Sequence, residues 1–170
     1  MTLEAFLLDL FSSIPPWLAV IIMAALPIVE LRLAIPLAIL NPPYGFGMDP
    51  VWAFSLSVIG NMLPVIPLLL FLEPVSNYLR RWKTWDRFFT WLFTRTHRNH
   101  SESFEKYGSI GLAIFVGIPL PATGAWTGCA AAFVFGFKFR NALIAIFAGV
   151  IIAGVVMTLL TVGINIFNGI

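Results

Sequence analysis

Four long apolar segments, separated by polar stretches, dominate the pattern of this chain. They cover residues 17–40, 51–72, 110–137 and 141–167. About 20 predominantly apolar residues in a helix are enough to cross the hydrocarbon core of a bilayer, and each segment is at least that long. The pattern therefore predicts an all-α chain whose apolar segments lie in a membrane.

Two of these segments contain helix breakers near their centres. Residues 17–40 are interrupted by Pro27 and Pro36, and the run Gly117–Gly128 within 110–137 holds two prolines and three glycines. Proline removes a backbone donor and clashes with the preceding turn. At membrane depth, the freed backbone groups are tolerated only if they are buried in protein or line a polar cavity. We interpret both segments as re-entrant helical hairpins; on these residues alone, spanning helices with a proline kink are an equal alternative.

The other two apolar segments, 51–72 and 141–167, are predicted to be full transmembrane helices. The last carries the small residues Ala145, Gly149 and Ala153 four positions apart, which favours close helix packing. A chain with only two full spans has little surface to enclose a pathway, so we expect a homodimer. The small-residue face is one contact for a second copy, and the chain's own hairpin is the alternative occupant.

Two polar stretches complete the pattern. Residues 1–14 place apolar side chains on one helical face, which predicts an amphipathic interfacial helix that is not removed as a signal sequence. Residues 73–107 are basic and hold an apolar, aromatic-rich stripe, which predicts a cytoplasmic stretch with a second amphipathic helix. That helix could lie on lipid or pack on its own bundle.

Composition supports the same class and excludes several functions. Of 170 residues, 59% are hydrophobic and 11% charged, whereas soluble domains average about 25% charged residues. We therefore expect a single membrane domain in the cell membrane. The net charge of +2 gives no basis for nucleic-acid binding, and the lone Cys129 excludes an internal disulfide. His97 and His100 in a solvated loop are a poor metal site.

The charge distribution favours hairpins over four full crossings. If all four segments crossed, Lys138 and Arg140 would lie on the side opposite the basic stretch 73–107. If the hairpins enter and return, all these basic groups share the cytoplasmic side, as the positive-inside rule requires. This arrangement is multi-pass, places both termini outside and makes the hairpins enter from opposite faces. It is an inverted repeat with both tips near the midplane.

Glu30 and Arg32, in the first hairpin, are the only charged residues inside any apolar segment. A charge at the bilayer centre costs about 2.5–3.5 kcal/mol on insertion scales, so the two should pair or face a polar cavity. The functional interpretation is that Glu30 binds a proton or a cationic group while Arg32 holds an anionic one. The structural interpretation is an ion pair that fixes the tip.

The second tip is uncharged but offers polar groups at a helix break. Backbone amides at the start of a half-helix favour anions. Asn61, in the predicted span 51–72, is a further polar group at membrane depth. An interhelical hydrogen bond is the simpler explanation for it. The predicted substrate or ion site lies between the two tips and comprises Glu30, Arg32, Asn61, Pro119, Pro121, Thr123, Gly124, Trp126 and Thr127.

Two motifs resemble a known family. Glu30-Leu31-Arg32-Leu33-Ala34-Ile35-Pro36 resembles the E-x-R-x-x-x-P pattern of the small multidrug export protein family, and the block from Glu105 to Gly128 resembles its second hairpin. Ala122 stands where that family would have glycine. More distantly, the family is similar to the DedA (VTT, SNARE-associated) superfamily, which implies facing re-entrant hairpins and, for some members, proton-coupled movement of undecaprenyl phosphate or other lipids. The arginine that follows the second DedA tip is missing here.

These observations favour a membrane transporter or exporter of a small amphipathic solute or a lipid-linked substrate, with Glu30 coupling transport to protons. The resemblance also implies a DedA-like translocase of undecaprenyl phosphate or phospholipid as an alternative. A non-transporting structural membrane protein is the alternative from another class. Membrane lipids and the substrate are the expected partners. The sequence shows no Walker A loop, zinc-type cluster or nucleophile elbow, so we expect no enzyme, cofactor or metal.

Overall fold

The computed structural model describes residues 10–11, 13–79, 102–120 and 123–168. Every regular element in these ranges is a helix, so the predicted all-helical class is confirmed. The predictions for most of 1–14, for the amphipathic helix and histidines within 80–101, and for Pro121 fall outside the described residues.

The chain divides into two compact units, each of which is described by itself. Unit 1 consists of Met1–Leu63 together with Val150–Ile170, and unit 2 consists of Pro64–Gly149. Helix α9 (Phe139–Asn168) is shared, because its first part belongs to unit 2 and its last part to unit 1. Each unit therefore contains part of α9.

In unit 1 the first apolar segment forms two short helices with a sharp break between them. Helices α2 (Pro16–Ala25) and α3 (Glu30–Ile39) have 10 residues each and pack against each other. At 1.5 Å per residue each is only about 15 Å long, about half the hydrocarbon thickness. The break predicted at Pro27 is present in residues 26–29, closed by a 2.9 Å bond from the Glu30 amide to the Leu26 carbonyl.

Pro36 does not interrupt the chain, contrary to the prediction from the sequence. It lies inside α3, which continues to Ile39. Proline at this position loses the bond that its own amide would have made and crowds the carbonyl one turn earlier, yet the helix continues beyond it. The Pro36 carbonyl still accepts from the Leu40 amide at 2.9 Å, so the helix ends in regular geometry.

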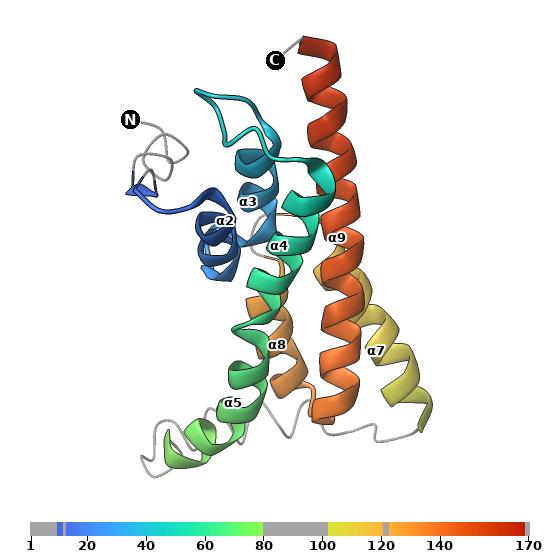
Figure 1. The fold of residues 1–170 in the computed structure, drawn as a ribbon. Coiled ribbons are helices and arrows are strands. Elements are labelled where there is room, and N and C mark those ends of the chain that lie inside the picture. Colours follow the sequence, from blue (N-terminus) through green and yellow to red (C-terminus); the bar gives the residue numbers. More distant parts are fainter. Residues whose placement is uncertain (1–9, 12, 80–101, 121–122, 169–170) are drawn as a thin grey trace. The chain divides into compact units, whose positions relative to one another are not determined.

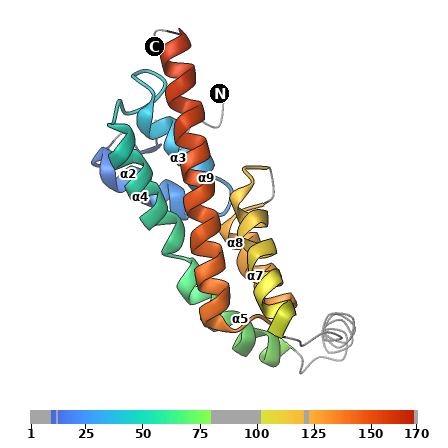
Figure 2. The same ribbon diagram turned by 90° about the vertical axis from the view of Figure 1, so that its right-hand side faces the viewer.

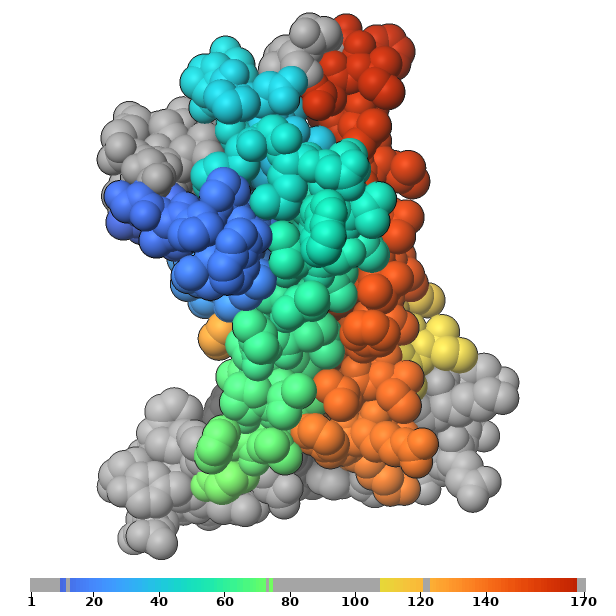
Figure 3. All heavy atoms as spheres, in the orientation of Figure 1, coloured from blue at the N-terminus to red at the C-terminus, as the bar shows by residue number. Residues whose placement is uncertain are grey.

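Helix α4 (Pro50–Met62) completes the bundle of unit 1 by packing on both α2 and α3. It begins at Asp49, whose Oδ1 accepts from the amides of Val51 at 2.9 Å and Trp52 at 3.3 Å, a regular N-cap. The contact with α2 is close because Gly60 has no side chain: a Cβ there would overlap the Ile21 carbonyl oxygen. Figure 3 shows α2 (blue) lying against α4 (blue-green). Figure 1 shows α3 and α4 running in opposite directions.

The last part of α9 packs on α4 within unit 1. A Cβ at Gly154 would lie 2.7 Å from Phe54 Cε2 and 3.6 Å from Val58 Cγ2, so this glycine permits the close approach. Figure 2 shows α9 as one continuous helix with its C-terminal part beside α3 and α4.

Unit 2 also contains two helices that follow each other across a break, α7 (Glu102–Gly117) and α8 (Ala125–Val134). Helix α7 packs on α8, which also contacts α5 (Val65–Leu79). The described residues between α7 and α8, 118–120 and 123–124, are not helical and lie in the predicted Pro/Gly tip. The predicted tip also included Ala125–Gly128, which form the first turn of α8. Gly124, with φ of 143°, lies where only glycine is unstrained.

Two helix boundaries differ from the sequence prediction. Helix α5 continues through Pro74 to Leu79 rather than ending at residue 72, and α7 begins at Glu102 rather than at residue 110. Hydropathy detects only the apolar part of a helix, whereas backbone hydrogen bonding extends into polar sequence. A turn at Leu63 and Pro64 also separates α4 from α5 within the predicted segment 51–72.

The small-residue face of α9 is covered by the chain itself. A Cβ at Gly149 would lie 2.6 Å from both the Ala113 carbonyl oxygen and Val116 Cβ, which belong to α7. Of the two predicted neighbours of this face, α7 of the same chain is the one that packs against Gly149. The expected homodimer stays a prediction.

Within the described part of the chain, two helical stretches are long and apolar enough to cross a membrane, Pro50–Leu72 and Phe139–Phe167. They correspond to the two predicted spans, 51–72 and 141–167. Helices α2 and α8, and the apolar part of α7 at Gly108–Gly117, are shorter. The re-entrant course of the hairpins and the inverted repeat stay predictions.

Candidate functional site

Glu30 combines burial, charge and an unusual backbone conformation. It is the first residue of α3, immediately after the break, and only 6% of its surface is exposed. Its φ is +46°, and among the described residues it is the only non-glycine with positive φ. This left-handed conformation costs about 1–2 kcal/mol for a residue with a Cβ. Backbone strain of this kind clusters at functional sites, and it makes Glu30 a candidate functional residue.

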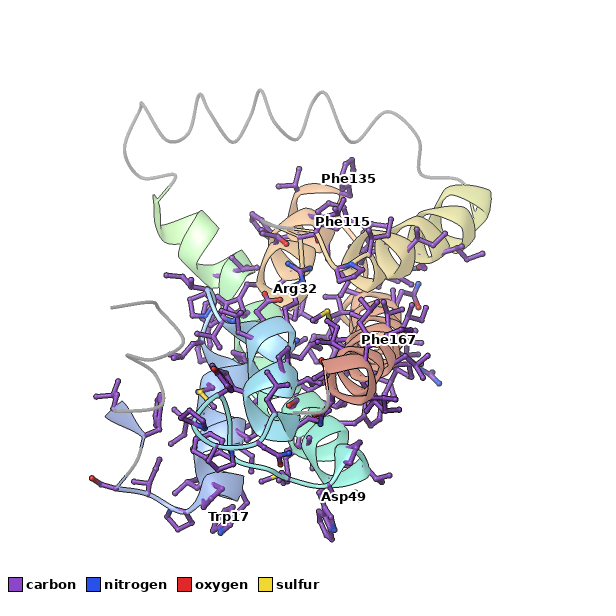
Figure 4. All side chains as sticks on the ribbon, turned by 90° about the horizontal axis from the view of Figure 1, so that it is seen from above. Trp17, Arg32, Asp49, Phe115, Phe135 and Phe167 are labelled. Carbon is purple, nitrogen blue, oxygen red and sulfur yellow. The ribbon has the colours of Figure 1, made fainter. Side chains whose placement is uncertain are left out.

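Arg32 follows in the same turn of α3 and is labelled in Figure 4. It is partly buried, and its guanidinium interacts electrostatically with the Glu30 carboxylate. Residues two apart on a regular helix do not face each other. Because Glu30 sits at the break in a left-handed conformation, the regular rule does not apply to this pair.

Asn61 is buried in α4 without the interhelical hydrogen bond that the sequence favoured. It is 1% exposed, and neither its Nδ2 nor its Oδ1 has a protein partner. The interhelical-bond interpretation is therefore wrong. Ser57, one turn earlier, is fully buried, and its Oγ also lacks a partner. Ser57 was not predicted as a site residue, although its i, i+4 spacing from Asn61 places both on one face of the helix.

Asn61 lies at the same end of unit 1 as Glu30. Its neighbour Gly60 approaches Ile21 and Ala24 in the last turns of α2, which lead directly into the break. Because α3 and α4 run in opposite directions, the end of α4 also lies near the start of α3 (Figure 1). Unit 1 therefore gathers an acid, a base and an unpartnered amide at the end that carries the break.

The polar groups of the second tip are largely used within the tip. The Thr123 hydroxyl lies 2.9 Å from the Ile118 carbonyl oxygen and 2.8 Å from that of Leu120. The Thr127 hydroxyl lies 3.2 Å from the Gly124 carbonyl oxygen. These hydroxyls donate to the backbone of the break and stabilise it, so they offer a ligand only their remaining lone pairs. Pro119 lies within the break itself.

Trp126 borders an apolar groove that the sequence did not reveal. The groove has a volume of about 380 Å³ and lies between α5 and α8 of unit 2. It is lined by Pro64, Pro67, Leu68, Phe71, Leu72 and Trp126. The groove depends on how α5 packs on α8, which no periodicity in the sequence specifies.

No group of three or more His, Cys, Asp or Glu that could hold a metal ion occurs within the described ranges. Cys129 is buried in α8, with its Sγ 4.0 Å from the Val65 carbonyl oxygen. This packing is that of a small apolar side chain rather than a reactive thiol.

The chain was compared with protein families, curated proteins and solved structures. Residues 30–156 match the family described as "Putative small multi-drug export protein". The match covers about three quarters of the chain and begins at Glu30. Neither a curated protein nor a solved structure matches it. With its two apolar spans, its buried Glu30 and this match, the chain belongs to the family of small multi-drug export proteins.

Proposed function

We propose that this protein is a membrane exporter of a small amphipathic solute, coupled to protons through Glu30. The observation that carries the proposal is Glu30 itself: a buried, strained carboxylate at a helix break in an apolar segment, with Arg32 beside it. Ionisable groups at membrane depth are costly and typically mark ion or substrate pathways. The export family to which the chain belongs is consistent with this role.

The chemistry available at the break is proton exchange on the Glu30 carboxylate. The Arg32 cation stabilises the ionised form, and protonation of Glu30 releases Arg32 to hold an anionic group. The unpartnered Asn61 amide can donate to or accept from a ligand in the same end of unit 1. An acid that alternates between these forms can couple proton movement to a conformational change.

The groove beside Trp126 supports an amphipathic substrate. Its lining is wholly apolar, and its volume of about 380 Å³ suits the apolar part of a small solute or a segment of a lipid chain. A polyisoprenyl phosphate or a phospholipid therefore stays a candidate substrate. The role of the second tip (Pro119, Pro121, Thr123, Gly124 and Thr127) and the convergence of the two tips stay predictions from the sequence.

The proposed membrane arrangement has two re-entrant hairpins, two full spans and both termini outside. The short lengths of α2, α3 and α8 support it, because a helix of 10 residues reaches only about half the hydrocarbon thickness. We expect a C-terminal reporter that is active only in the cytoplasm to be silent, and an externally active one to report. An active cytoplasmic reporter at Ile170 contradicts the arrangement.

The function is tested by flux into proteoliposomes that contain the purified protein. Lipophilic cations and lipid phosphates are offered in separate arms, each with and without a pH gradient. We expect flux of a lipophilic cation that rises severalfold when the gradient is imposed and collapses with a protonophore. Flux confined to the lipid-phosphate arm favours the translocase alternative. Equal flux in protein-free liposomes across all arms contradicts transport.

A further inference from the structure

The last part of α9 carries a polar stripe on the face that meets α4. Gly154, Thr158, Thr161 and Asn165 are spaced by four, three and four residues, which places them on one side of a helix. Gly154 contacts Phe54 and Val58 of α4, so this side faces α4. In a membrane protein, the polar stripe therefore points into the bundle rather than toward lipid.

Several side-chain atoms along this contact are buried and lack a protein hydrogen-bond partner. On α9 they are Thr158 Oγ1 and Asn165 Oδ1; on α4 they are Ser57 Oγ and both polar atoms of Asn61. Thr161 differs, because its hydroxyl bonds the Met157 carbonyl of its own helix at 2.8 Å. All the unpartnered buried side-chain atoms of the described residues lie in unit 1, on these two helices.

Ser57 and Asn61 also point toward the interior of unit 1. Around α4 they fall between Gly60, which faces α2, and Phe54 and Val58, which face α9. Both side chains are almost completely buried. They continue the line of polar groups of α9 toward the end of unit 1 that holds Glu30.

The other end of this line opens into a cavity. It has a volume of about 640 Å³ and lies where the loop before α4 meets the end of α9. Asn41, Asp49 and Asn165 supply polar groups to its lining, together with Met48 and Val162. Asn165 therefore belongs both to the cavity and to the row of unpartnered atoms.

Leaving these polar atoms without hydrogen bonds costs too much free energy for the contact between α4 and α9 to exclude water. An unsatisfied buried donor or acceptor costs about 1–3 kcal/mol, and Ser57, Asn61, Thr158 and Asn165 together carry five such atoms. Buried polar groups of this kind are satisfied by ordered water where the site offers two to four polar partners. Here the partners are arranged in a row.

The row of polar side chains from Asn165 through Thr158 and Ser57 to Asn61 is called the α4–α9 seam. We propose that this seam is a hydrated path from the cavity lined by Asp49 and Asn165 to the buried end of unit 1. From Pro50 to Asn61 the path follows α4 for about 17 Å, roughly half the hydrocarbon thickness. It gives Glu30 access to water from one side of the membrane. The use of the path for protons rests on the proposed function, whereas the path itself does not.

The path is tested by the reactivity of single cysteines, which needs no transport assay. Ser57→Cys, Thr158→Cys and Asn165→Cys are each made in a Cys129→Ala background. They are treated with a small membrane-impermeant cationic methanethiosulfonate from the side on which a Met48→Cys loop reference reacts. Because thiolates form in water and not in hydrocarbon, we expect all three to react at least about tenfold faster than a lipid-facing control, Leu159→Cys.

Leu159 is the matched control because it lies one residue from Thr158 but is 68% exposed on the outside of unit 1. Size-exclusion profiles identify any variant that misfolds. If Ser57→Cys misfolds, the reactivity of Thr158→Cys decides the test. The proposal is overturned if the seam cysteines react no faster than Leu159→Cys, or only from the opposite side. In Glu30→Gln the cysteines should stay reactive even though proton-coupled flux is lost, which separates failure of the path from failure of the function.

Discussion

Replacing Glu30 with glutamine is expected to abolish the pH-dependent part of substrate flux while leaving membrane insertion near normal. Glutamine keeps the size of the side chain and its ability to hydrogen-bond, but it cannot exchange a proton. Loss of a positioned proton-transfer group typically lowers a rate about 100-fold or more. The measurement is flux into proteoliposomes with and without an imposed pH gradient, at matched protein content.

Accumulation of Glu30→Gln and of one further variant separates a coupling role from a structural one. If Glu30 serves only to neutralise Arg32, Glu30→Gln should accumulate poorly. Loss of a partner destabilises a protein by about 3–5 kcal/mol for a fully buried charge, and by less for a partly buried one such as Arg32. The double variant Glu30→Gln/Arg32→Gln should then restore accumulation. Normal accumulation of Glu30→Gln with unchanged gradient-dependent flux contradicts the coupling role.

Adding a single methyl group at Gly60 is expected to destabilise unit 1 strongly. In Gly60→Ala the new Cβ overlaps the Ile21 carbonyl oxygen and lies 2.9 Å from Ala24 Cβ, so α2 and α4 must move apart. Overpacking a tight contact costs about 1–3 kcal/mol, and the obstacle here is backbone that cannot rotate away. The measurement is the Tm of the purified protein in detergent, with a larger loss for Gly60→Val.

Gly163→Ala is the matched control for this substitution. Gly163 is also a helical glycine of unit 1, but a Cβ there meets nothing within 4 Å. Alanine in place of helical glycine should raise stability by about 0.5–1 kcal/mol. Equal Tm values for the two variants indicate that the close approach of α4 to α2 is wrong.

The sequence predicted the helix breaks because their cause is local. Pro27 and the Pro/Gly run after Gly117 act on the backbone of their own turn, so both breaks lie where composition places them. Pro36 is equally visible in the sequence, yet α3 continues through it. Whether a proline ends a helix depends on tertiary packing that can stabilise the remaining turns, and a linear pattern does not contain that information.

The same limit explains what was predicted of the candidate site. Glu30 and Arg32 were identifiable because a charge in an apolar segment is conspicuous by composition alone. The unpaired state of Asn61 was not, because it depends on which side chains α2, α3 and α9 bring to that face of α4. The groove at Trp126 likewise arises only when α5 and α8 meet.

The covered face at Gly149 constrains any quaternary structure of this protein. Because Ala113 and Val116 already pack against Gly149, a helix of a neighbouring molecule cannot bring its backbone close to α9 at this position. What the last part of α9 still presents outward is a ridge of branched side chains: Ile152, Val155 and Leu159. Helices that meet through such ridges stand about 8–10 Å apart and interlock by knobs and holes. An oligomer built on α9 would therefore resemble a leucine-zipper contact rather than a glycophorin-like crossing.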